Sequence, residues 1–242
     1  MIVKVEGIIL SVSDYQESSR ILQVLTKEKG LIGIIAKGCK SVKFPLRAYT
    51  NSYTYGYFYI YYKENKLSLL SNVDIINSFS NIRLDIELIS YMAYLCDLTY
   101  QVAKQNDSED IFDILISSLN KINDKLNPLI ITNIVELKYL DYLGISLNLD
   151  SCVKCGSREN IVTIDGDEGG FICKDCYKDE LIVDKKTIKM IRMYYLVDIK
   201  SITSIKVSDI VSREINNFIN KYYDRYTGLF LKSKDFLNKL LS

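Results

Sequence analysis

Four cysteines form two Cys-x-x-Cys pairs, Cys152 with Cys155 and Cys173 with Cys176. Seventeen residues separate the pairs, and the 242-residue chain contains no histidine. Each Cys-x-x-Cys turn directs two sulfurs at one point, so two such turns complete the tetrahedral thiolate shell that zinc prefers. Because protein sulfur fills all four positions, no site remains for water or substrate. The pattern predicts a structural zinc ion rather than a catalytic one.

Other chemistry is compatible with paired cysteines. Two dithiol redox motifs, two disulfides or a rubredoxin-like iron site have similar spacing. Gly156 favours a metal, because a tight turn after the second cysteine lets backbone amides point at thiolate sulfur. Gly169-Gly170 similarly lets the chain double back before the third ligand. The other two cysteines, Cys39 and Cys96, have no partner nearby in the sequence.

A basic run is the second feature with chemical potential. From Lys37 to Arg47 four side chains are cationic and none is acidic, and Gly38 and Pro45 break the segment into a loop. Such cations neutralise phosphates and displace counterions, which gives salt-dependent binding that reads no base sequence. A merely solvated loop is the alternative. We expect Arg20, Lys37, Lys40, Lys43 and Arg47 to be the residues that bind nucleic acid, either DNA or RNA.

A row of tyrosines follows the basic run. They occupy odd positions, so along an extended strand most of them share one face. They are Tyr49, Tyr53, Tyr55, Tyr57, Tyr59 and Tyr61. Exposed aromatic side chains on small barrels stack unpaired bases. Alternatively, the row lines a barrel face or packs against helices, since tyrosine favours strands in general.

Charge is distributed unevenly along the chain. The formal net charge is +1, but residues 1–83 carry +5, residues 84–150 carry −7 and residues 151–242 carry +3. A polyanion would therefore dock at the N-terminal part. The acidic middle faces solvent or docks a basic patch. No signal peptide and no run of 18 apolar residues is evident, so we expect a soluble, cytoplasmic protein.

The residue pattern changes from strands to helices near residue 80. Five strand-like segments precede it and indicate a small barrel: Val3–Ser13, Arg20–Thr26, Leu31–Ala36, Tyr53–Tyr62 and Lys66–Val73. Helical periodicity follows in segments 82–103, 111–122, 128–143, 185–197, 208–226 and 234–241. Asn127 and Ser208 are expected to cap two of these helices, and Gly144 and Gly228 to end them.

Motifs for catalysis are missing from the sequence. There is no phosphate-cradling Gly-x-x-x-x-Gly-Lys-Ser/Thr loop, and a chain without histidine cannot build a serine triad. Two interpretations fit the carboxylates Asp165, Asp167 and Glu168. They form a magnesium site of a nuclease, or they form a solvated turn. The sequence therefore indicates neither nucleotide hydrolysis of this type nor serine-triad chemistry.

Several short motifs, in their order along the chain, resemble the RecO family of bacterial DNA repair and recombination proteins. The N-terminal ones are Glu6-Gly7-Ile8-Ile9-Leu10, Asp14-Tyr15-Gln16-Glu17-Ser18-Ser19-Arg20, Thr26-Lys27-Glu28-Lys29-Gly30 and Ala36-Lys37-Gly38. The later ones are Leu137 to Gly144 leading into Cys152-Val153-Lys154-Cys155-Gly156, then Gly169-Gly170-Phe171-Ile172-Cys173 and Gly228-Leu229-Phe230-Leu231-Lys232-Ser233. The segment after Lys37-Gly38 departs from the family, because Val42 and Phe44 interrupt its charges.

The resemblance implies an α+β protein with an N-terminal oligonucleotide-binding (OB) β-barrel followed by a helical domain with an inserted four-cysteine zinc module. The expected segments are the barrel (1–80), a helical domain (81–150), the zinc module (151–180) and the rest of the helical domain (181–242). It implies a non-enzymatic mediator that binds single- and double-stranded DNA, anneals strands and, with RecR, helps RecA load onto DNA coated with single-strand-binding protein, whose acidic, apolar C-terminal tail is a further partner. A zinc-ribbon adaptor between proteins, without nucleic-acid binding, is the alternative function.

Overall fold

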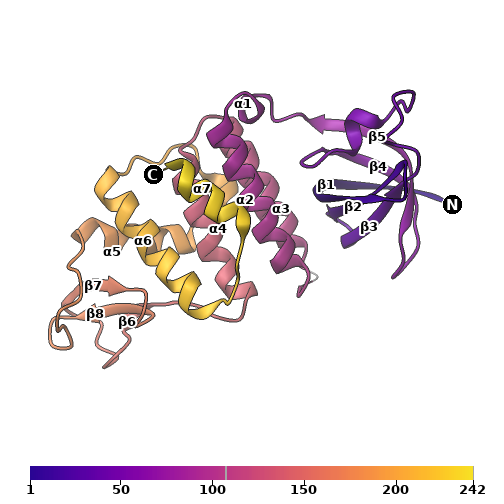
Figure 1. Ribbon diagram of the computed structural model, residues 1–242. Helices are drawn as coiled ribbons and strands as arrows, with labels where there is room; N and C mark the ends of the chain where they lie inside the picture. The colour runs from indigo at the N-terminus through magenta and orange to yellow at the C-terminus, as the bar shows by residue number, and fades with distance from the viewer. Residues whose placement is uncertain (107, 242) are drawn as a thin grey trace. The chain divides into compact units, whose positions relative to one another are not determined.

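The computed structural model describes residues 1–106 and 108–241 (Figure 1). Its contacts divide the chain into two compact units. The first contains Met1–Asp124 and the C-terminal segment from Leu231, and the second contains Lys125–Phe230. The division into four segments that the sequence predicts stays a prediction. In the two-unit division, the C-terminal helix belongs to the unit that contains the barrel.

Five strands of the first unit close into a barrel. They are β1 (Ile2–Tyr15), β2 (Ser19–Thr26), β3 (Gly30–Ala36), β4 (Tyr55–Tyr61) and β5 (Ser68–Asn77). Their order around the barrel is β1-β2-β3-β5-β4, and β3 pairs with β5 in parallel while the other pairs are antiparallel. Each strand therefore pairs with two neighbours, although β3 and β5 pair only at Ile34 and Ile35 of β3. The expected α+β fold with an OB-type barrel is confirmed.

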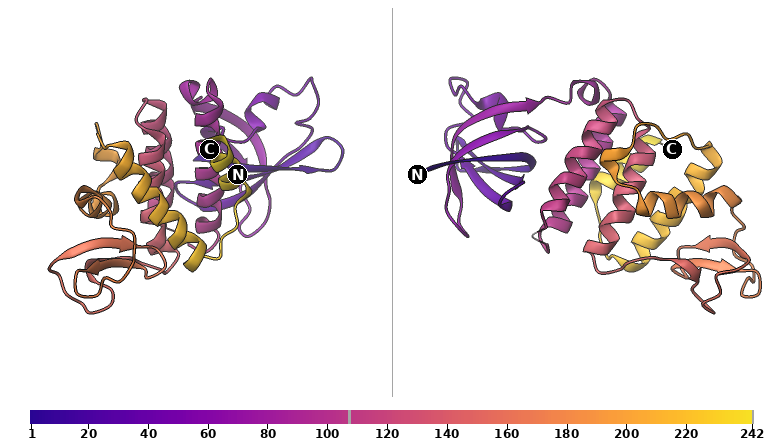
Figure 2. Two further views of the ribbon diagram at one scale, coloured as in Figure 1. Left: turned by 60° about the vertical axis from the view of Figure 1, so that its left-hand side comes forward. Right: turned by 180° about the vertical axis from the view of Figure 1, so that it is seen from behind.

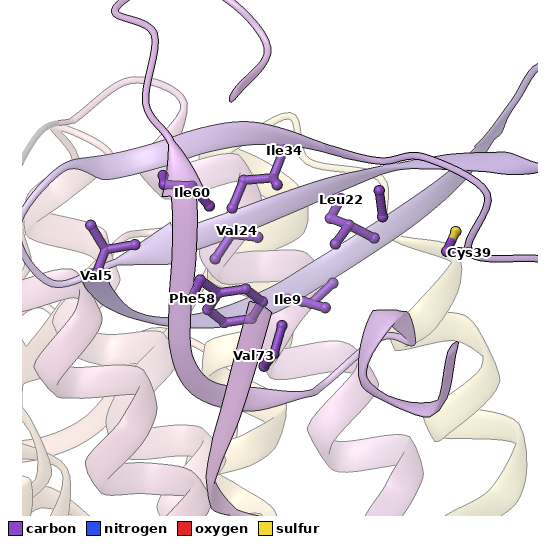
Figure 3. Close-up of a cluster of buried hydrophobic side chains, with 10 residues drawn as sticks. Val5, Ile9, Leu22, Val24, Ile34, Cys39, Phe58, Ile60 and Val73 are labelled. Atoms are coloured by element: carbon purple, nitrogen blue, oxygen red, sulfur yellow. The ribbon is translucent and has the colours of Figure 1, made fainter. Parts of the chain in front are cut away.

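Alternating side chains fill the barrel. Figure 3 shows apolar residues from all five strands that converge in its interior, among them Val5, Leu22, Ile34, Phe58 and Val73. Cys39 joins them with no exposed surface, although it lies in the basic run rather than in a strand. The thiol therefore serves as a small apolar core group.

Helices of the first unit follow the barrel in sequence. They are α1 (Ser80–Arg83), α2 (Ile86–Ala103), α3 (Glu109–Asn123) and α7 (Lys232–Leu241). The side chain of Asp85 caps α2 by accepting from the backbone N–H of Glu87. α2 and α3 lie side by side (Figure 2). α7 packs on α2, where the Ser233 hydroxyl donates to Asp97 over 2.6 Å.

The second unit contains three longer helices, α4 (Pro128–Tyr142), α5 (Lys185–Leu196) and α6 (Asp209–Tyr226). Asn127 caps α4 as expected, since its side chain accepts from Ile130, and Gly144 takes the left-handed conformation after it with φ of 73°. Ser208 occupies the N-cap position of α6 as expected, but its side chain accepts no capping hydrogen bond.

A small sheet of the second unit carries the cysteines. Its strands are β6 (Asn148–Cys152), β7 (Ile161–Asp165) and β8 (Gly170–Cys173), in the order β6-β8-β7. The sequence analysis did not predict these strands, because segments of four or five residues show too little periodicity. Among the described residues, no helix is both long and apolar enough to cross a bilayer.

Candidate metal centre and nucleic-acid interface

The four paired cysteines converge at one end of the small sheet. Cys152 ends β6 and Cys173 ends β8, and the turns that follow bring Cys155 and Cys176 to the same place. The four sulfur atoms all lie within 4.8 Å of one another. Tetrahedral zinc with Zn–S bonds of about 2.3 Å requires sulfurs about 3.8 Å apart. The cluster therefore has the size of a metal site.

Two similar turns shape the cluster. The backbone N–H of Gly156 donates to the carbonyl of Cys152 over 2.8 Å, and that of Cys176 donates to Cys173 over 3.1 Å. Gly156 has φ of 76°, which a side chain would disfavour. Cys152 and Cys173 are buried, whereas Cys155 is exposed. The two inner sulfurs are thus anchored in the fold, and the outer ones close the site from the solvent side.

The pKa values of the thiols are also those expected of a site that binds a cation. Burial opposes ionisation of Cys152, but N–H groups of Cys173, Cys155 and Lys154 directed at its sulfur outweigh it and lower the pKa to about 6. The pKa of Cys176 is raised to about 12, first by its hydrogen bond with Cys155 and then by burial. Adjacent sulfurs cannot all become thiolates without a positive charge between them. A divalent ion at this site would supply that charge.

Disulfides do not explain the pairing. The Sγ atoms of Cys155 and Cys173 are 3.6 Å apart, far beyond the roughly 2.05 Å of a disulfide bond. All six cysteines are free. In the described part of the chain, this is the only group of three or more metal-ligating side chains with such proximity.

Carboxylates near the cluster have structural partners. Asp165 accepts from the backbone N–H groups of Asp167 and Glu168, both over 2.9 Å, so it stabilises the turn between β7 and β8. Lys154 bridges two acidic side chains, at 3.2 Å from Glu168 and 2.7 Å from Glu180. This arrangement favours the turn interpretation of these carboxylates over a magnesium site.

The basic loop, which we define as residues 37–47, is fixed to the barrel by its apolar residues. Cys39 is buried in the barrel core, and Phe44 packs against the same core. The N–H of Lys40 donates to the carbonyl of Ser18 over 3.0 Å. Phe44, which interrupts the charges in the sequence, is therefore an anchor. The loop has a defined course along the barrel surface rather than a loose one.

Three cations of the basic loop are open to solvent. Lys37, Lys43 and Arg47 are exposed. None of the three forms an ion pair with any described residue. They retain the free charge that a phosphate contact requires.

Lys40 and Arg20 differ from those three because both contact one carboxylate. Lys40 Nζ lies 2.9 Å from Asp14, and Arg20 Nε lies 3.8 Å from it. The hydrogen bond from Lys40 lowers the pKa of Asp14 and keeps it ionised. Arg20 also donates to the side chain of Asn51 over 2.9 Å. Asp14 was not predicted to contact these cations, although it lies in the same sequence motif as Arg20.

The tyrosine row does not form one continuous face. Tyr55 is buried and stacks on Phe79 with ring centroids 5.9 Å apart. Tyr57 and Tyr59 are half-buried on the outer barrel wall, where the Lys4 ammonium lies 3.8 Å from the ring centre of Tyr57. Tyr49 and Tyr53 precede the strand altogether, because β4 begins at Tyr55. The packing interpretation therefore holds for Tyr55, whereas base stacking by the more exposed tyrosines stays a prediction.

Two family models match adjacent parts of the chain. Recombination protein O N terminal matches residues 1–79, and Recombination protein O C terminal matches residues 83–235. Similar proteins include DNA repair protein RecO of Bacillus pumilus, 33% identical over 100% of this chain and 96% of the relative. RecO of Halalkalibacterium halodurans is 34% identical over 99% of this chain and 95% of the relative. RecO of Bacillus subtilis is 31% identical over 100% of this chain and 96% of the relative. These matches together cover nearly the whole chain, and they show that the chain belongs to the RecO family of DNA repair proteins.

Proposed function

We propose that this protein is a non-enzymatic recombination mediator that binds single- and double-stranded DNA and anneals complementary strands. The observation that carries the proposal is the basic loop, which presents the unpaired cations Lys37, Lys43 and Arg47 on an OB-type barrel. Barrels of this kind commonly bind single strands in a positively charged groove. In the cell, the protein would act in the cytoplasm on DNA of the nucleoid.

Strand annealing needs no bond chemistry from the protein. Complementary strands repel each other through their phosphates, and cations that neutralise the phosphates lower the free energy of bringing strands together. Contacts to phosphate alone leave the base edges free for pairing. Cations on a fixed loop perform this task better than cations on a loose one, because less side-chain and backbone entropy is lost on binding.

The metal is proposed to be zinc, held by Cys152, Cys155, Cys173 and Cys176. Four thiolates in tetrahedral proximity suit zinc, although iron binds the same set. When bound, the ion would brace the small sheet of the second unit, whose strands are too short to hold together by packing alone. Four protein ligands leave it no role in catalysis.

Partners are proposed from the family: RecR, RecA and the tail of single-strand-binding protein. A groove in the second unit supports the tail as a ligand. It has a volume of about 260 Å³ and is lined by Leu126, Ile130 and Ile131 together with Lys125 and Lys206. Apolar walls with two ammonium groups suit an acidic, apolar peptide. Lys206→Glu should weaken binding of a labelled tail peptide, and unchanged binding would place the tail elsewhere.

A salt titration of fluorescent single-stranded DNA tests the central proposal. We expect tight binding at low salt. The logarithm of the binding constant should fall linearly with the logarithm of the salt concentration, with a slope of about −0.7 for each phosphate contacted. The triple variant Lys37→Glu, Lys43→Glu, Arg47→Glu should abolish most of this dependence. Lys40→Glu, which alters a cation already paired with Asp14, is the matched control. Absent DNA binding in the unaltered protein would favour the adaptor function instead.

A further inference from the structure

A small cavity of the first unit adjoins the basic loop. Its volume is about 180 Å³. Residues of three chain segments line it: Ala48, Tyr49 and Asn51; Thr54 and Tyr55; and Ile75, Asn77, Ser78 and Arg83. Sites for drug-sized molecules typically have about 300–1,000 Å³. The cavity therefore suits one planar ring system rather than a larger ligand.

The lining combines apolar surface with a few polar groups. Tyr49 and Ile75 remain 39% and 40% exposed, so a ligand would cover apolar surface that water now contacts. The amide side chains of Asn51 and Asn77 already hydrogen-bond within the protein through both oxygen and nitrogen, so Arg83 is the main polar group open to a ligand. Aromatic stacking together with hydrogen bonds from arginine is chemistry that recognises an unstacked nucleobase.

Arg83 is held in place by two backbone carbonyls. Its Nε donates to Ser78 over 2.7 Å, and its Nη2 donates to Tyr53 over 3.1 Å. A guanidinium has five N–H donors, so others remain for a ligand. Arg83 is exposed and forms no ion pair with a described residue. Its charge is available and its plane is fixed before any ligand binds.

Two residues next to the lining have an unusual backbone. Tyr53 and Phe79 have φ of 66° and 49°, which residues other than glycine adopt at an energetic cost. Each is held by neighbours: the N–H of Tyr53 donates to Ile9 over 2.8 Å, and the Phe79 ring stacks on Tyr55. The cavity is thus framed by over-determined segments and keeps its shape without a ligand.

The cavity continues directly from the basic loop. The short helix η1 (Arg47–Thr50) begins with the last cation of that loop and carries Tyr49 in the cavity wall. We propose that the cavity takes one unpaired nucleobase of a DNA strand whose phosphates lie on the basic loop. This inference rests on the proposed DNA binding and adds Tyr49 as the stacking residue and Arg83 as a hydrogen-bonding one.

The test compares an ordinary single strand with an abasic strand of equal length, by fluorescence anisotropy across a range of salt concentrations. Stacking of one base contributes about 1–3 kcal/mol, so Tyr49→Ala should weaken binding of the ordinary strand about 5- to 150-fold without changing the salt slope. Tyr49→Phe should retain most of the affinity. Tyr61→Ala removes a similarly exposed tyrosine, 45%, that does not line the cavity, and should have little effect.

The abasic strand isolates the base contribution. The abasic strand should bind the unaltered protein more weakly than the ordinary strand does. Because it has no base to stack, Tyr49→Ala should not weaken its binding further, and Arg83→Gln should remove no base contact from it. Circular dichroism of each variant checks that the fold is retained. Salt-dependent binding that is equal for both strands would overturn this inference while leaving the proposed function intact. No binding of either strand would overturn both.

Discussion

The metal centre and the basic loop show two ways in which a sequence encodes a site. In the metal centre, two local turns deliver all four ligands, and each pair spans only four residues. The five cations assigned to DNA binding, four in the basic loop and Arg20 outside it, have similar chemistry in the sequence, yet the fold gives them different surroundings. Asp14 lies 26 residues before Lys40 and engages both Lys40 and Arg20.

This contrast shows what residue type alone conveys. Thiolates at close spacing repel each other unless a cation joins them, so their arrangement and their function are linked. A lysine is stable in water with or without a partner, and an exposed ion pair contributes little to stability. Its availability for DNA therefore depends on which carboxylate the fold places beside it.

Removal of the metal should give the largest effect. Structural zinc in small peptides provides about 10–16 kcal/mol, comparable with the whole stability of a domain. Cys173→Ser, or a chelator, should therefore unfold the small sheet, as measured by thermal unfolding together with elemental analysis. The chelator should have no further effect on Cys173→Ser. Salt-dependent DNA binding should survive in that variant, and its loss would contradict the separate roles of the two sites.

Charge reversal should come next in size. Each of Lys43→Glu and Arg47→Glu should lower the salt slope of single-strand binding by about 0.7, since one phosphate contact is lost. Lys40→Glu should lower it less, because this cation is already paired. Equal slopes for all three variants, measured by anisotropy titration, would show that the pairing with Asp14 does not distinguish the cations.

Releasing the paired cations should have a smaller effect in the opposite direction. Asp14→Asn removes the carboxylate that engages Lys40 and Arg20, so one or both can contact phosphate. We expect tighter DNA binding and a salt slope steeper by about 0.7 for each cation recruited. Glu17→Gln, which removes an exposed acidic residue of the same hairpin that forms no ion pair in the described structure, is the control.

The smallest effect concerns the stability, at low pH, of the region around the four paired cysteines. The hydrogen bond from Lys154, followed by one from the backbone of Lys178, lowers the pKa of Glu180 to about 2 from its usual 4.5. A depressed pKa adds stability that is complete above pH 4.5 and is lost as pH falls toward 2. The difference in unfolding free energy between the unaltered protein and Glu180→Gln should therefore shrink over that range. A constant difference would contradict the role of Lys154.

Much of the fold could be predicted because the signals are local. Strand alternation defined the five barrel strands to within a few residues, and Asn127 and Gly144 correctly marked the ends of α4. The shortest strands, β6 to β8, were missed because their pairing depends on chain segments that the turns and the metal ligands bring together. Ser208 had the right residue type for a cap, but its side chain does not accept the hydrogen bond.

The sequence by itself determined the candidate metal centre, since two Cys-x-x-Cys turns fix the type and number of the available ligands and most of their geometry. It also determined that the N-terminal part is basic and barrel-like. Only the tertiary structure decided which cations are free, because Asp14 reaches Lys40 and Arg20 across the barrel surface. Only the tertiary structure brought Tyr49 and Arg83 to one cavity, because side chains far apart in sequence become neighbours only through long-range packing.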